Sequence, residues 1–202
     1  NHDISTDPFN GVEVKPEKLS AIAKVLRREG CRNINYVGGD PTPNLHTIVE
    51  SLKYLDVNVP LLWNSNFYCS EETMKILADL IDIWLPDFKY YSDDCAKRLS
   101  KVDNYFAVVS RNHKIAHDNG DIIIRHLVLP NHIQCDTKPL LEWIAANLPR
   151  ALVNIMAQYR PEHEVAAAPH LFKDIARRPT FQEIDIAMKI ARNLAIVYEP
   201  VS

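Results

Sequence analysis

Closely spaced cysteines are missing from this sequence of 202 residues. Neighbouring cysteines are at least 26 positions apart, which matches neither an iron–sulfur nor a zinc motif; they are Cys31, Cys69, Cys95 and Cys135. Such scattered thiols also argue against a disulfide framework. We therefore expect a protein of a reducing compartment, the cytoplasm.

An excess of charge and long apolar runs are missing as well. The formal net charge is −3 and 24% of the residues are charged, so there is no electrostatic case for nucleic acid or a membrane surface as a partner. No apolar run approaches the roughly 18 residues of a transmembrane helix. Only 5 glycines stand against 13 prolines, which favours short, stiff loops. We expect a single domain over residues 1–202.

Strand and helix patterns alternate along the chain. Apolar runs predict strands at 33–37, 60–64, 81–85, 121–129 and 151–156, with a further short strand at 197–199. Helical spacing of apolar residues predicts helices at 16–29, 45–55, 70–80, 104–118, 137–147 and 180–195. An irregular stretch is expected between 85 and 104, and a loop or short helix over 162–179. Because βαβ crossovers are right-handed, the strands should be parallel, which predicts an α/β fold, a partial (β/α) barrel.

Residues 34–42 join a β-branched strand to two glycines, an acid and a proline. In α/β folds, ligands bind at the C-terminal ends of strands. Gly38 and Gly39 can expose backbone N–H groups because no Cβ blocks the approach of a ligand. Asp40 can accept hydrogen bonds from a ligand ammonium. The alternative is a strand-to-helix turn in which Asp40 is only a cap.

Gly38–Thr42 is similar to the Gly-Gly-Glu-Pro-Thr motif of radical S-adenosylmethionine (SAM) enzymes. Within that superfamily, the chain resembles the pyruvate formate-lyase activating enzymes. Three later strand ends match the family in the same order, and they are Trp63–Phe67, Trp84–Lys89 and Ile123–Pro130. The similarity extends over roughly residues 1–160.

The resemblance implies a SAM site at these strand ends. Asp40, where relatives usually have Glu, would bind the SAM ammonium, and Arg125 would pair with the SAM carboxylate through a bidentate fork. Asp87 matches a carboxylate that binds a monovalent cation in relatives, and Lys89 lies on the same side of the strand. The complete set of implied site residues is Gly38, Gly39, Asp40, Asn64, Ser65, Asp87, Lys89 and Arg125.

The iron–sulfur loop of the family is absent from this sequence. Relatives hold a 4Fe-4S cluster with a Cys-x3-Cys-x2-Cys loop, and the segment after its third cysteine resembles Asn1–Ser5 of this chain. We expect the chain to begin just downstream of that loop, with the first strand of the barrel and the cluster ligands missing. The segment 1–202 by itself should then be inactive.

In complete form, the resemblance implies reductive cleavage of SAM to a 5′-deoxyadenosyl radical that abstracts hydrogen. The cluster would receive its electron from an external donor. The implied substrate is a glycine of a glycyl-radical enzyme or an unidentified small molecule. A non-catalytic fragment that binds SAM or a partner protein is an alternative.

Histidines and acids allow competing interpretations. His113 and His117 are four positions apart on a predicted helix, and a solvated helix face is favoured there over a metal site. Asp87 and Lys89 can also be read as a simple ion pair at the rim. The competing enzyme class is a metal-dependent hydrolase with its site at the barrel mouth, built from His126, His132, Asp40 and Asp87.

Overall fold

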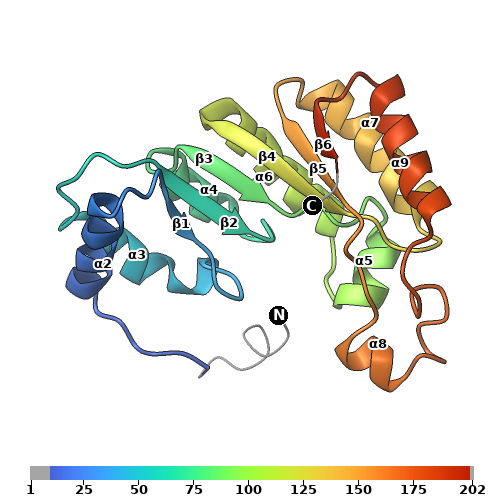
Figure 1. The fold of residues 1–202 in the computed structure, drawn as a ribbon, viewed down its shortest axis with the longest axis horizontal. Coiled ribbons are helices and arrows are strands. Elements are labelled where there is room, and N and C mark those ends of the chain that lie inside the picture. Colours follow the sequence, from blue (N-terminus) through green and yellow to red (C-terminus); the bar gives the residue numbers. More distant parts are fainter. Residues whose placement is uncertain (1–9, 201–202) are drawn as a thin grey trace.

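The computed structural model describes residues 10–200 and places six strands in one parallel sheet (Figure 1). The resemblance seen at Asn1–Ser5 lies outside the described residues. Each strand pairs with the next in sequence order. The strands are β1 (Ile34–Tyr36), β2 (Leu61–Ser65), β3 (Ile83–Pro86), β4 (Asp121–Leu127), β5 (Leu152–Met156) and β6 (Tyr198–Pro200). This topology confirms the predicted α/β partial barrel.

Helices connect the strands, because parallel neighbours need a crossover connection and this is usually an α-helix. Ser70 accepts a hydrogen bond from the backbone of Thr73 and so begins the helix after β2, while Thr180 and Glu183 form a reciprocal capping box. The helices are α2 (Pro16–Arg28), α3 (Leu45–Leu52), α4 (Glu71–Ala78), α5 (Asp93–Ser100), α6 (Tyr105–Asn119), α7 (Lys138–Asn147), α8 (His163–Ala167) and α9 (Phe181–Asn193), with a 3-10 turn η1 (Thr42–Asn44) and a π-helical turn η2 (Ile133–Thr137).

The stretch between 85 and 104 is not irregular, contrary to the sequence-based prediction. It contains α5, which begins after Ser92, whose hydroxyl accepts a hydrogen bond from the backbone of Cys95. The helix has only one buried residue, Ala96, so its sequence lacks the apolar periodicity on which the prediction depended. Its first turn carries Asp93 and Asp94, which suits the positive end of the helix dipole.

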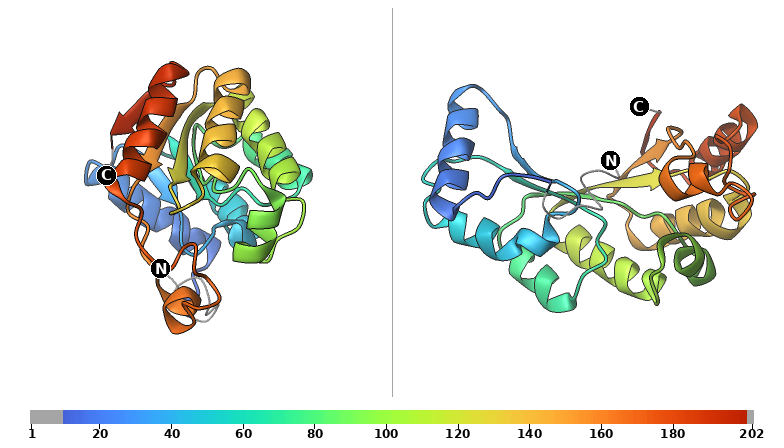
Figure 2. Two further views of the ribbon diagram at one scale, coloured as in Figure 1. Left: turned by 90° about the vertical axis from the view of Figure 1, so that its right-hand side faces the viewer. Right: turned by 90° about the horizontal axis from the view of Figure 1, so that it is seen from below.

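The two faces of the sheet differ in what covers them. In Figure 2, helices α3, α4, α6 and α7 lie along one face of the curved sheet. Along β4, Ile122, Ile124 and His126 are buried against that layer, whereas the alternate positions are exposed or only partly buried. Arg125 belongs to this second, open set, because successive side chains in a strand point to opposite faces. The alternation therefore directs Arg125 to the concave side of the barrel.

The hydrophobic core fills the space between the sheet and its helices. Four large aromatic side chains are fully buried there, namely Trp63, Phe67, Trp84 and Phe88. Phe67 packs edge-on against Trp84 with ring centroids 5.8 Å apart. No helix within residues 10–200 is both long enough and apolar enough to cross a membrane.

Candidate functional site

Polar side chains at the C-terminal ends of β1 and β2 contact each other directly. The Ser65 hydroxyl donates to Asp40 Oδ2 at 3.0 Å, and the backbone N–H of Asn66 donates to the same oxygen at 2.8 Å. The backbone N–H of Thr42 donates to Asp40 Oδ1 at 2.9 Å. Asp40 therefore ties the end of β1 to the end of β2, in addition to any part it takes in binding a ligand.

The glycine turn before Asp40 exposes its backbone. Gly38 has φ of +122°, a conformation that side chains with a Cβ rarely adopt. A Cβ built at Gly38 would meet nothing within 4 Å, so open space lies beside this backbone. Gly38 and Gly39 are both exposed. The turn leaves room for a ligand to approach the main chain.

A second polar cluster joins the ends of β3 and β4. Asp87 Oδ1 lies 2.7 Å from Arg125 Nη2, and Asp87 Oδ2 lies 3.1 Å from Lys89 Nζ. The backbone of Asp87 donates to the carbonyl of Ser65 at 3.0 Å, which links this cluster to the end of β2. The side chains of Asp87 and Arg125 are 16% and 26% exposed, so solvent screens this pair less than a surface pair.

Two buried polar atoms beside this cluster have no hydrogen-bond partner among the described residues. They are Arg125 Nε and Asn154 Oδ1. Arg125 and Asn154 are register partners on β4 and β5. A buried donor or acceptor without a partner costs about 1–3 kcal/mol. One donor, Arg125 Nε, and one acceptor, Asn154 Oδ1, are therefore available to a ligand on the open face of the sheet.

The structure thus brings most of the implied site residues to one edge of the sheet. Asn64 lies on β2 opposite Leu85 and is buried, one residue before Ser65. Contacts run in turn through Asp40, Ser65, Asp87 and Arg125 across four consecutive strands. Sequence reasoning missed Asn154, although a polar residue at an inward position of an apolar strand was a signal that could have found it.

The hydrolase site built from His126, His132, Asp40 and Asp87 does not form. His126 is buried on the helix-covered face, with Nδ1 2.8 Å from the Phe88 carbonyl and Nε2 2.9 Å from Thr137 Oγ1. Neither histidine contacts Asp40 or Asp87 through a hydrogen bond or ion pair within residues 10–200. His132 lies instead beside Asp136, 2.9 Å from its Oδ2.

The prediction of a solvated helix face at His113 and His117 is wrong, because both side chains are buried. His113 Nδ1 donates to the carbonyl of Val109 at 2.8 Å, and its ring stacks on Phe88 with centroids 4.3 Å apart. His117 contacts Asp118 instead. The two imidazoles therefore contact neighbouring protein groups separately and do not face one shared metal position.

Burial of His113 gives an acid-dependent loss of stability. Burial lowers the pKa of His113 to about 4, below the ordinary value of 6.5. Between these two values the unfolded chain binds a proton that the folded chain does not, so stability is complete above pH 6.5 and is lost as the pH falls toward 4. The full shift corresponds to about 3 kcal/mol. We expect the free energy of unfolding of His113→Phe to depend less on pH between 4 and 6.5, as measured by urea unfolding at several pH values. An unchanged pH dependence would contradict the role given to His113.

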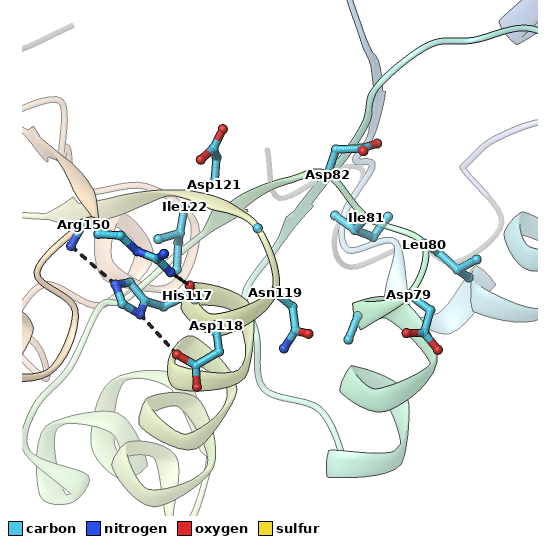
Figure 3. A pocket seen from close by; sticks show the side chains of 12 residues that line it. Asp79, Leu80, Ile81, Asp82, His117, Asp118, Asn119, Asp121, Ile122 and Arg150 are labelled. Atoms are coloured by element: carbon cyan, nitrogen blue, oxygen red, sulfur yellow. Dashed lines mark hydrogen bonds and ion pairs between the residues drawn. The ribbon is translucent and has the colours of Figure 1, made fainter.

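A cleft of about 640 Å³ lies away from these strand ends (Figure 3). Asp82, Asp121 and Arg150 line it, and these residues lie at the starts of β3, β4 and β5. The backbone of Arg150 donates to His117 Nε2 at 3.4 Å. Barrel enzymes carry their chemistry at the opposite, C-terminal edge. We therefore assign the site to the Asp40–Arg125 edge and not to this cleft.

The parallel sheet and the charged side chains at its strand ends are typical of a (β/α)-barrel protein that binds a ligand at the C-terminal ends of its strands. The family model of the radical SAM superfamily matches residues 2–144. The chain belongs to this superfamily.

Two individual proteins are similar to it. An uncharacterized protein from Methanocaldococcus jannaschii is 43% identical over 207 residues, covering 98% of this chain and 60% of that protein. The chain therefore spans about 60% of the length of this curated relative. In fold, it matches a crystal structure of a domain of pyruvate-formate lyase-activating enzyme from Bacteroides vulgatus with a TM-score of 0.64 and 15% identity, over 85% of this chain and 99% of the other.

The residues present fit SAM but not an iron–sulfur cluster. SAM carries a carboxylate, an ammonium and ribose hydroxyls, and the strand ends offer carboxylates, cations and exposed glycine backbone for them. Arg125 Nε and Asn154 Oδ1, which have no hydrogen-bond partner within residues 10–200, add one donor and one acceptor. A 4Fe-4S cluster requires thiolates that this chain does not supply in one place, since its four cysteines include no group of three.

Proposed function

We propose that residues 1–202 form one radical SAM core domain whose SAM site lies at the C-terminal ends of β1 to β5. The observation that supports this most strongly is the run of contacts from Asp40 through Ser65 and Asp87 to Arg125. A fold alone does not identify a function. Here the same edge combines an open glycine turn, two carboxylates and two cations, which are complementary to the charged end of SAM.

Each side chain has a role that its position suggests. Asp40 Oδ1 accepts one hydrogen bond, from Thr42, and a carboxylate oxygen can accept two, so it can also bind the SAM ammonium. Lys89 is the more accessible cation, with a side chain 37% exposed, and would meet the SAM carboxylate. Arg125 is already paired with Asp87 and would hold the Asp87 carboxylate in position. Asp87, Asn64 and Ser65 would hold the ribose or a monovalent cation.

Cleavage of SAM to methionine and a 5′-deoxyadenosyl radical, which would abstract a hydrogen atom from the substrate, would need one electron supplied by an external donor through a 4Fe-4S cluster. Residues 1–202 do not bring together three thiolates to hold that cluster. The residues of this chain would contribute by orienting SAM at the strand ends. We propose a cytoplasmic location, because all four cysteines are free.

For the substrate, we propose a glycine of a glycyl-radical enzyme, with a small molecule as the alternative. The proposal rests on the resemblance to the pyruvate formate-lyase activating enzymes. The open concave face of the sheet is compatible with a protein loop entering the barrel. Binding of SAM or of a partner protein without SAM cleavage would place this protein in the non-catalytic class instead.

The test is SAM cleavage by the full-length protein, purified without oxygen and supplied with iron and sulfide. We expect 5′-deoxyadenosine to form only when both SAM and a reductant are present. Lys89→Met should weaken SAM binding by about one to two decades, because a charge-assisted hydrogen bond contributes about 1.5–3 kcal/mol. Chromatography of the products and SAM titration provide the two measurements.

The matched control is Lys75→Met. Lys75 forms an ion pair with Glu71 at 2.8 Å on helix α4, so this variant removes an ion-paired lysine away from the strand ends. Its SAM affinity should equal that of the wild type. A protein that carries the cluster and binds no SAM, or a Lys89 variant with unchanged affinity, would contradict the proposed site.

A further inference from the structure

Four side chains with metal-binding atoms meet beside the barrel mouth. They are Cys95 from α5 and three residues of η2 and its cap, His132, Cys135 and Asp136. Their ligand atoms all lie within 4.8 Å of one another. Cys95 Sγ is 3.9 Å from Cys135 Sγ, and these two sulfurs lie 3.5 Å and 3.4 Å from His132 Nδ1. Asp136 Oδ2 is 3.6 Å from Cys135 Sγ.

Four of these separations, between the two sulfurs and from sulfur to His132 Nδ1 or Asp136 Oδ2, agree with a tetrahedral ion. Zinc–sulfur bonds of about 2.3 Å and zinc–nitrogen or zinc–oxygen bonds of about 2.0 Å put two sulfurs about 3.8 Å apart in a tetrahedron. They put sulfur about 3.5 Å from nitrogen or oxygen. The shortest edge of the site is the 2.9 Å from His132 Nδ1 to Asp136 Oδ2, where a hydrogen bond now lies. That edge would lengthen by about 0.4 Å when the ion replaces the proton.

The outer contacts of the cluster orient its ligands. His132 Nε2 lies 2.9 Å from Asp174 Oδ2, leaving Nδ1 to face the two sulfurs. Asp174 is in turn paired with Arg98. The other oxygen of Asp136 accepts from the backbone of Tyr91 and Ser92 at 2.9 Å each. A carboxylate behind a metal-binding histidine is the usual outer shell of zinc sites.

We propose that Cys95, His132, Cys135 and Asp136 bind one zinc ion in a closed structural site. Four protein ligands leave no open position for water, which distinguishes a structural from a catalytic zinc. Two thiolates with one imidazole select a softer divalent ion over magnesium or calcium. Binding releases the two thiol protons and the Nδ1 proton of His132 to solvent, and no electron is transferred.

The position of the site gives it a structural consequence. Cys95 lies on α5, which follows the strand end carrying Asp87 and Lys89, while η2 follows β4, which carries Arg125. A zinc ion would therefore crosslink the two loops that flank the second polar cluster. Because the unfolded chain holds no such preformed site, bound zinc should raise the free energy of unfolding.

The test is metal content and metal affinity of the full-length protein, purified under reducing conditions, with zinc and iron counted separately. We expect one zinc per chain, and Co²⁺ added to metal-free protein should give the intense visible bands of tetrahedral thiolate coordination. Cys95→Ser and Cys135→Ser should each weaken zinc binding by more than about 100-fold, and Asp174→Asn by about 10–100-fold. The matched control is Cys31→Ser, which removes a cysteine outside the cluster and should retain full zinc binding.

Cys135 is exposed, so its serine variant is expected to remain folded, and circular dichroism checks this. Zinc binding by wild type that equals binding by the Cys95→Ser/Cys135→Ser double variant would overturn the proposal. So would a reduced protein that takes up no zinc but forms a Cys95–Cys135 disulfide in air. Neither result depends on SAM cleavage, so the zinc site and the proposed function fail separately.

Discussion

Replacing Asp87 by asparagine is expected to lower the free energy of unfolding by about 2–3 kcal/mol, between the values for exposed and buried pairs. The variant leaves the partly buried guanidinium of Arg125 without its Asp87 partner, and Arg125 Nε already has no hydrogen-bond partner among the described residues. Lys89 can turn into solvent and should contribute little to this loss. Urea unfolding of wild type and variant measures the difference.

Two further variants test the reason for that loss. Asp87→Asn combined with Arg125→Met removes both charges and should recover much of the stability, because the cost comes from the unpaired charge. The matched control is Asp103→Asn, since Asp103 pairs with Lys97 at 2.9 Å and its side chain is 70% exposed. That variant should change stability by less than about 1 kcal/mol. Equal effects of Asp87→Asn and Asp103→Asn would show that the barrel-mouth pair behaves as an ordinary surface pair.

The sequence was sufficient for the first five strands because each of them carries a clear local signal, whereas the signal for β6 was weak. Apolar β-branched runs such as Ile122–Ile124 predict strands, and the glycine and proline after β1 predict its end. The pairing of Arg125 could also be anticipated, since a guanidinium in an apolar strand requires a partner. That this partner is Asp87 depends on the register of β3 and β4, which no local pattern specifies.

The cysteine cluster shows where sequence reasoning fails. Cys95 and Cys135 are 40 positions apart, and only the packing of α5 against η2 brings their sulfurs within 3.9 Å. Part of the signal was local, because His132, Cys135 and Asp136 fall within five consecutive positions. The fourth ligand comes from α5, the helix that the apolar pattern missed. Because this helix was not predicted, the sequence did not indicate that Cys95 lies next to the other three residues.

Asp40→Asn is expected to weaken SAM binding by the full-length, cluster-loaded protein by about one to two decades. The substitution keeps the size of the side chain but removes the charge that would meet the SAM ammonium, a loss of about 1.5–3 kcal/mol. It also places an amide N–H among donors, since Thr42, Ser65 and Asn66 all donate to this carboxylate. A loss of stability is therefore expected as well, and urea unfolding measures it separately from SAM titration.

Two comparisons separate ligand binding from capping. Asp82→Asn is the matched control, because Asp82 Oδ2 accepts from the backbone of Leu61 at 2.8 Å and so caps the opposite end of β2. It should cost stability without changing SAM affinity. Asp40→Glu restores the usual family residue and its charge, and should bind SAM more tightly than Asp40→Asn. If Asp40→Asn loses stability like Asp82→Asn but binds SAM as the wild type does, Asp40 is only a cap that joins β1 to β2, and the ammonium must be bound elsewhere.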